Sequence, residues 1–216
     1  MEYLGHIIYE DRSNSMIGEI VNEFNVKVNT LLGTFSNLTS SIKNDLLDKY
    51  CSSFYGSNLC ALYDKDMKRL QISQRKAIRR VWYLPWRAHG NLLPHISGYL
   101  PVDVTLDKRF MNFYISGLNS KNSVLKFIFE NVLYCYGRIG RNLKHVCNKY
   151  DIQMSSQYKV YQFNYAIVDK WKGNCLPENI RLGCQVKELL LMRDSIDPWL
   201  LERQECQSII DYLTQL

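Results

Sequence analysis

Basic side chains are concentrated on a predicted helix over residues 64–82, where they could neutralise the phosphates of a polyanion. Apolar residues recur there at three- and four-residue steps, as Met67, Leu70, Ile78 and Val81, and only Gln74 interrupts the stripe. At about 1.5 Å per residue this helix would be roughly 28 Å long, and the cations on its other sides could contact several phosphates in succession. A solvated surface helix is the alternative interpretation. The basic residues of this helix and of the loop after it are Lys65, Lys68, Arg69, Arg75, Lys76, Arg79, Arg80 and Arg87.

A second basic segment begins at Gly137. Arg138, Arg141 and Lys144 fall near the start of a predicted helix, where backbone N–H groups and the helix dipole favour phosphate. The segment lacks the Gly-Lys-Ser/Thr ending of a nucleotide-binding P-loop. It is therefore interpreted either as a second nucleic-acid contact or as a capped surface helix.

Other residue types give weaker signals. His145 and Cys147 are closer together than the paired ligands of structural zinc sites, and Asp64 and Asp66 are interpreted as a helix N-cap and a first-turn residue. No metal, cofactor or catalytic residue is therefore predicted. Aromatic residues at helical spacing are more typical of a core than of base stacking. The aromatic residues with such spacing in the C-terminal part are Tyr150, Tyr158, Tyr161, Tyr165 and Trp171.

The positive charge lies mainly in the middle of the chain. The 216 residues carry a net charge of +6, and residues 64–88 hold eight basic and two acidic side chains, whereas residues 1–63 hold four and seven. This distribution is expected when one surface meets nucleic acid or an anionic membrane. No apolar run reaches the length of about 18 residues that a membrane helix needs, and the first residues do not form a signal peptide. We expect no membrane partner and an intracellular protein, cytoplasmic or nuclear and not secreted, whose seven cysteines are buried or free thiols.

The hydrophobic pattern predicts a mainly α protein with one short strand over residues 3–9 that has no evident partner. The first long helix carries an apolar stripe, and a second helix begins near residues 39–41. Proline and glycine crowd residues 84–101 and predict a break. Further helices are expected over 105–118, 123–135, 138–149, 158–171, 179–193 and 200–213. The first stripe consists of Ile17, Ile20, Phe24, Val28, Leu31 and Phe35, and the second helix is expected to point Ile42, Leu46, Tyr50 and Phe54 inward.

An ordered set of short motifs resembles the reverse transcriptases of non-LTR (LINE-type) retrotransposons. It covers about residues 3–118, and its specificity lies in the order and spacing of the motifs. The basic helix ends in the family's leucine-proline step. The motifs are Tyr3-Leu4-Gly5-His6-Ile7-Ile8, Lys49-Tyr50-Cys51, Phe54-Tyr55-Gly56, Leu59, Leu62-Tyr63, Arg79-Arg80-Val81-Trp82-Tyr83-Leu84-Pro85, Leu100-Pro101-Val102 and Arg109-Phe110.

The resemblance implies a chain that starts where the polymerase palm ends. It implies a remnant of a palm-edge strand at 1–12, a helical thumb-like bundle at 13–84, a Pro/Gly-rich linker at 85–104 and a small helical C-terminal domain at 105–216. A palm in that family holds Mg²⁺ on an early aspartate and a Tyr/Phe-Ala-Asp-Asp hairpin, and neither motif occurs in this sequence. We therefore expect no polymerase or nuclease activity from this polypeptide alone.

The leading hypothesis is a reverse-transcriptase fragment that binds template RNA or an RNA–DNA hybrid through phosphates, with little base specificity. An upstream palm would be its partner if the chain is part of a longer protein. Two alternatives stay open. One is a standalone helical interaction protein whose basic stripe meets an acidic protein. The other is a non-functional retroelement relic, which the strand without an evident partner favours.

Overall fold

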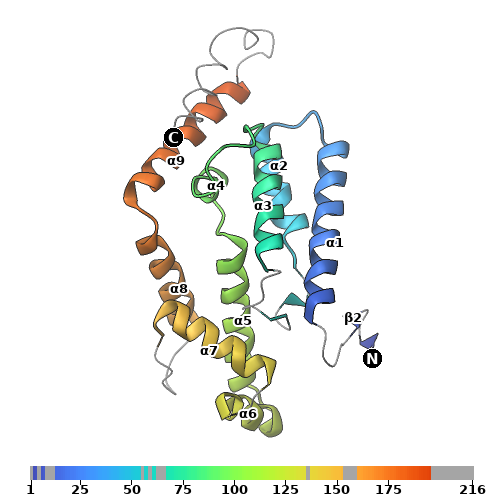
Figure 1. The fold of residues 1–216 in the computed structure, drawn as a ribbon, viewed down its shortest axis with the longest axis vertical. Coiled ribbons are helices and arrows are strands. Elements are labelled where there is room, and N and C mark those ends of the chain that lie inside the picture. Colours follow the sequence, from blue (N-terminus) through green and yellow to red (C-terminus); the bar gives the residue numbers. More distant parts are fainter. Residues whose placement is uncertain are drawn as a thin grey trace. The chain divides into compact units, whose positions relative to one another are not determined.

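The chain is mainly α-helical in the computed structural model, as the sequence predicts (Figure 1). The structure describes residues 2–3, 6–7, 13–54, 56–57, 60–61, 67–134, 137–152 and 160–195. The predicted helix over 200–213 and the Asp64 cap lie outside these residues. The helices are α1 (Ser13–Thr34), α2 (Ser40–Leu46), the π-helix η1 (Leu47–Cys51), α3 (Met67–Val81), α4 (Leu93–Ser97), α5 (Val102–Leu118), α6 (Ser123–Glu130), the 3₁₀-helix η3 (Val132–Tyr134), α7 (Arg138–Tyr150), α8 (Val160–Asn174) and α9 (Pro177–Ser195).

The N-terminal strand differs from the expectation. Instead of one strand over residues 3–9 without a partner, β1 (Glu2–Tyr3) pairs in antiparallel fashion with β2 (His6–Ile7). Glu2 is opposite Ile7 and Tyr3 is opposite His6. Pairing between neighbours in sequence closes only a short loop, which costs less entropy than pairing with a distant strand.

The described helices form two compact units that are discontinuous in sequence. The first unit draws on the ranges 1–20, 55–70 and 101–174, and the second on 21–54, 71–100 and 175–216. The second unit takes in α9 because α9 packs against α4. A compact unit need not fold independently, so the consecutive thumb and C-terminal domains stay a prediction.

The apolar stripe expected along α1 is buried as far as Leu31. Phe35, the last residue of the expected stripe, is exposed because α1 ends at Thr34 and Phe35 lies in the following turn. Burial of this stripe against the rest of the protein stabilises α1 more than its intrinsic helix propensity does. The buried members are Ile17, Ile20, Phe24, Val28 and Leu31.

The inward face of the second helix was predicted wrongly. Ile42 and Tyr50 are exposed, with 47% and 67% of their surface accessible, although Phe54 is buried. The buried side chains recur at three- and four-residue steps through both helices, on the face next to the apolar one that was predicted. The face that packs inward instead consists of Ser40, Lys43, Asn44, Leu47 and Cys51.

Hydrogen bonds explain why polar side chains of α2 are buried. Asn44 Nδ2 donates to the carbonyl of Ser97 at 2.9 Å, and Asn44 Oδ1 accepts from Trp82 Nε1 at 3.1 Å. Both polar ends of the amide are thus satisfied, so its burial carries little desolvation penalty. Asn44 thereby links α2, the residue that follows α3, and the end of α4.

The segment expected as a linker contains α4. Pro94 lies in the first turn of this helix, where a proline lacks no needed donor, and Gly98 ends it at a φ of 76°. Leu93 and Ile96 are fully buried. Proline and glycine therefore mark the ends of a packed helix within the range 85–104, and α5 already begins at Val102.

In the first unit, α5 packs against α6, α7 and α8. The helices predicted over 105–118, 138–149, 158–171 and 179–193 are confirmed as α5, α7, α8 and α9, with shifted ends. The helix predicted over 123–135 ends earlier, because α6 stops at Glu130 and η3 follows. No helix of the described ranges is long and apolar enough to cross a lipid bilayer.

Candidate nucleic-acid interface

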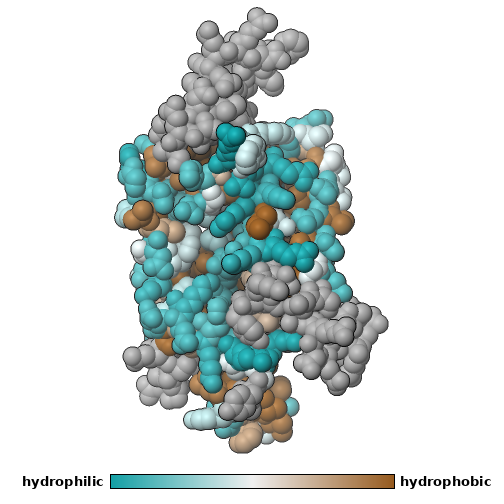
Figure 2. All heavy atoms as spheres, in the orientation of Figure 1, coloured by the Kyte–Doolittle hydropathy of each residue, from teal (hydrophilic) through white to brown (hydrophobic). Residues whose placement is uncertain are grey.

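Helix α3 has the two-sided character that the sequence predicts. Met67, Leu70, Ile78 and Val81 are buried, and the interrupting Gln74 is half-buried, with its Nε2 donating to the Leu100 carbonyl at 3.4 Å. In the face of the molecule drawn in Figure 2, hydrophilic residues gather over α3. The apolar side therefore fixes the helix, and the opposite side is available to solvent.

Most of the predicted basic residues are exposed. Arg79 and Arg138 are half-buried, and Lys65 lies outside the described residues. Arg138, Arg141 and Lys144 belong to α7 of the first unit, whereas the C-terminal part of α3 belongs to the second. The exposed ones are Lys68, Arg69, Arg75, Lys76, Arg80, Arg87, Arg141 and Lys144.

Arg79 and Arg75 lie against the loop that follows α3. Arg79 donates to the Ala88 carbonyl from Nε at 3.2 Å and from Nη2 at 2.8 Å. Burial, together with the nearby charge of Arg75, lowers the pKa of Arg79. A Cβ atom added to Gly90 would lie 3.3 Å from the guanidinium of Arg75. The structure thus gives Arg79 a loop-holding role, which the sequence did not indicate.

Arg80 lies on the side of α3 that faces α1. Its Nη1 donates to Oδ1 of Asn29 at 2.7 Å, in an exposed environment. Asn29 is neutral, so this hydrogen bond leaves the positive charge of the guanidinium uncompensated. Lys76, one turn earlier, is exposed as well. These two cations are the ones best placed to meet an anion beside the end of α3.

The end of α3 is a Schellman motif with an unusual residue. Leu84 N–H donates to the Arg79 carbonyl at 2.8 Å and Tyr83 N–H to the Arg80 carbonyl at 3.4 Å. Tyr83 therefore occupies the left-handed position, at a φ of 51°, that glycine usually takes. A bulky residue there costs about 1–2 kcal/mol of backbone strain. The surrounding contacts must offset that cost.

Lys43 supplies one such contact, and its role was not predicted from the sequence. Only 1% of its surface is accessible, and its Nζ donates at 2.7 Å to both the Ser36 carbonyl and the Tyr83 hydroxyl. Nζ also lies 5.1 Å from the centroid of the Tyr83 ring. Both acceptors are neutral, and in the described part of the chain no carboxylate pairs with this ammonium group. A lysine within a polar stretch of helix carries no sequence signal of burial.

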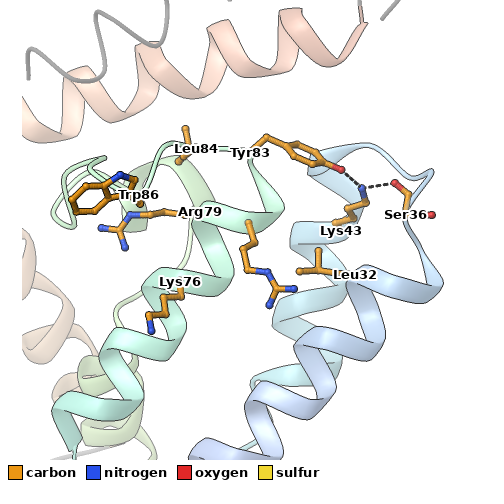
Figure 3. A pocket seen from close by; sticks show the side chains of 9 residues that line it. Leu32, Ser36, Lys43, Lys76, Arg79, Tyr83, Leu84 and Trp86 are labelled. Atoms are coloured by element: carbon orange, nitrogen blue, oxygen red, sulfur yellow. Dashed lines mark hydrogen bonds between the residues drawn. The ribbon is translucent and has the colours of Figure 1, made fainter.

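A pocket of about 770 Å³ adjoins these residues (Figure 3). Tyr83 and Trp86 are exposed at it, with 61% and 78% of their surface accessible. The Arg87 guanidinium lies 4.9 Å from the centroid of the Trp86 ring. Cations and aromatic rings thus surround one cavity within the second unit. Its lining residues are Leu32, Ser36, Lys43, Lys76, Arg79, Arg80, Tyr83, Leu84 and Trp86.

The second basic segment forms the start of α7. Gly137 is the N-cap residue in extended geometry, and as a glycine it has no side chain to cap the helix. The buried Asn142 donates from Nδ2 to the Cys60 carbonyl at 2.7 Å and so fixes the first turns of the helix. The basic residues of this segment stay a predicted second contact with nucleic acid.

The remaining aromatic residues and possible metal ligands have different environments. Tyr150 is buried and donates to Asp107 Oδ2 at 2.8 Å, which is a core role, whereas Tyr165 is exposed. The side chains of Tyr158 and Tyr161 lie outside the described part. Among the described residues, no group of three histidine, cysteine or acidic side chains could hold a metal ion. Burial raises the pKa of Cys147 to about 11.

Comparison of the chain with models of known protein families, with curated proteins and with solved structures finds no match. The resemblance to non-LTR reverse transcriptases over residues 3–118 therefore stays a prediction from the sequence.

Proposed function

We propose that this chain binds the phosphate backbone of RNA or of an RNA–DNA hybrid through the exposed basic side of α3. The observation that carries the proposal is the pair of exposed cations, Lys76 and Arg80, at a pocket that also has exposed aromatic rings. Phosphate contacts of this kind give affinity with little base specificity. The chain would serve as the thumb and post-thumb part of a reverse transcriptase.

Polymerisation would need a partner under this proposal. An upstream palm would supply the aspartates and the Mg²⁺ ions, and the present chain would hold the template or the hybrid. The order of motifs in residues 3–118 supports this arrangement. On its own, the chain would be a binding module and not an enzyme.

Salt dependence tests the electrostatic part of the proposal. If about four phosphates are neutralised, log affinity falls against log salt with a slope of roughly −3 to −4. Fluorescence anisotropy of labelled RNA at several salt concentrations measures this slope. A K76E/R80E variant should bind at least tenfold more weakly and show a shallower slope.

The matched control is K121E/K172E, which changes the net charge by the same amount at two exposed lysines of the first unit. It should bind RNA as the unaltered chain does. Binding that ignores salt, or an equal loss in both double variants, would refute an interface on α3.

One observation favours a second candidate, a helical interaction protein. An apolar pocket of about 400 Å³ lies in the second unit, and the exposed Val26, Phe35 and Tyr50 are among its lining residues. Exposed apolar surface of this kind often marks protein contacts. A protein partner that binds equally well in the presence of excess RNA would favour this candidate.

A further inference from the structure

We infer that the pocket at the end of α3 holds one unpaired nucleotide of the bound strand, with its phosphate at Lys76 and Arg80 and its base stacked on Trp86. This inference rests on the proposed nucleic-acid binding and specifies the form of the strand. It predicts a preference for single strands over duplexes.

The size and the walls of the pocket fit such a ligand. A volume of about 770 Å³ lies within the range of sites that enclose small organic molecules. Trp86 is 78% exposed although indole is a large apolar group, and a planar base would cover it. Because every base has a π-face, stacking on this ring does not depend on sequence.

The charges of the pocket favour the phosphate. Lys76, Arg79 and Arg80 line it together with the buried Lys43. Arg79 is half-buried and engages the Ala88 carbonyl through both Nε and Nη2. Lys76 and Arg80 are exposed, and Arg80 bonds to the exposed Asn29 through Nη1, so these two are the cations that can reach an anion. The Lys43 ammonium raises the local positive potential, because charges act more strongly where protein replaces water.

Tyr83 forms a second wall and is held in place. Its hydroxyl accepts from Lys43 at 2.7 Å, and its backbone is in the left-handed region. The ring is thus fixed beside the cations while 61% of the residue remains exposed. An aromatic ring that is both fixed and exposed loses little conformational entropy when a base packs against it.

The aromatic rings account for the expected strand preference. Phosphates are accessible on single strands and duplexes alike, so Lys76 and Arg80 do not distinguish the two forms. In a duplex the bases already stack on one another, and unstacking a base costs free energy. A ring such as Trp86 can therefore add affinity only for an unpaired nucleotide.

Anisotropy titrations with a labelled single-stranded RNA and with a duplex RNA of the same length test the inference. The W86A variant should weaken single-strand binding by about fivefold or more, in keeping with the loss of one stacked base, and leave duplex binding unchanged. A single strand with abasic sites also lacks the stacking base. It should therefore bind the unaltered chain no more tightly than the intact single strand binds the W86A variant.

The Y134A variant is the matched control, because Tyr134 is also a highly exposed aromatic residue but belongs to the first unit. It should bind both RNAs normally. Equal losses for single strand and duplex in W86A, or no loss at all, would overturn the stacking inference while phosphate binding stands. If neither RNA binds the unaltered chain, the proposed function and the stacking inference both fail.

Discussion

The hydroxyl of Tyr83 accepts a 2.7 Å hydrogen bond from the ammonium group of Lys43, which is almost completely buried. This bond joins Tyr83, two residues after the end of α3, to a buried residue of α2. It also orients an exposed ring at the candidate pocket. The stability of the second unit and the shape of its pocket are therefore coupled through one pair of side chains.

The Y83F substitution should destabilise the protein by about 1–3 kcal/mol, because it removes an acceptor from a buried charged donor. Lys43 would keep only the Ser36 carbonyl among its present acceptors. The free energy of unfolding from urea titrations measures the effect. Y134F is the control, since Tyr134 is 83% exposed, and should unfold like the unaltered chain. Equal stability of Y83F and the unaltered chain would contradict the role given to this bond.

The close approach of α9 to α4 gives a second prediction. A Cβ atom at Gly183 would overlap with Cβ of His95, which cannot move without its backbone. G183A should therefore lower the free energy of unfolding by about 1–3 kcal/mol through overpacking.

The control for G183A is G33A, in which a Cβ atom would meet nothing within 4 Å. In helix α1 this change should stabilise the protein by about 0.5–1 kcal/mol, because alanine loses less backbone entropy than glycine. Thermal unfolding of both variants separates the two effects. A G183A protein as stable as G33A would show that α9 does not pack closely on α4.

The sequence predicts the helices well where an apolar stripe decides their position. The stripe of α3 and most of the stripe of α1 are buried as expected. Prediction from the sequence fails where single tertiary contacts decide whether a residue is buried. The amide of Asn44 is buried because Trp82 and Ser97 satisfy it, and neither partner is visible from the local pattern.

The candidate pocket could be predicted only in part, for the same reason. The exposed cations of α3 follow from the helical period. The left-handed backbone of Tyr83 does not, because a tyrosine is rarely found there and gives no local signal. The burial of Lys43 depends on acceptors that come from Ser36 and Tyr83, so the charge inside the pocket emerges only from the fold.

A buried polar group in the first unit gives a third prediction. Asp107 Oδ2 accepts from Lys149 Nζ at 2.6 Å and from Tyr150 Oη at 2.8 Å, and only 2% of Asp107 is exposed. D107N should lower the free energy of unfolding by about 2–4 kcal/mol, because it removes the closer of two counter-ions from Lys149 and weakens both hydrogen bonds to Oδ2. Chemical denaturation measures the loss. The control is D103N, which changes the more exposed of the two carboxylates and should lower the free energy of unfolding by less than about 1 kcal/mol. If D107N lowered it by no more than D103N does, the role given to Asp107 would be contradicted.

The same group predicts how stability depends on alkaline pH. Burial raises the pKa of Tyr150, and the adjacent Asp107 carboxylate raises it further. The pKa of Lys149 is also raised, because the attraction of Asp107 and Asp103 outweighs the lowering by burial. For both residues the folded state holds the proton more tightly than the unfolded state. Their contribution to stability is therefore complete below about pH 10 and is lost as the pH rises further.

The free energy of unfolding should then fall by about 1.4 kcal/mol per pH unit above pH 10 for Tyr150 alone. Urea titrations between pH 8 and pH 11 measure this slope. Y150F should be less stable at pH 8, since it lacks the hydrogen bond to Asp107, yet lose stability less steeply above pH 10. Identical slopes for Y150F and the unaltered chain would show that Tyr150 ionises equally in the folded and unfolded states, and would contradict its burial beside Asp107.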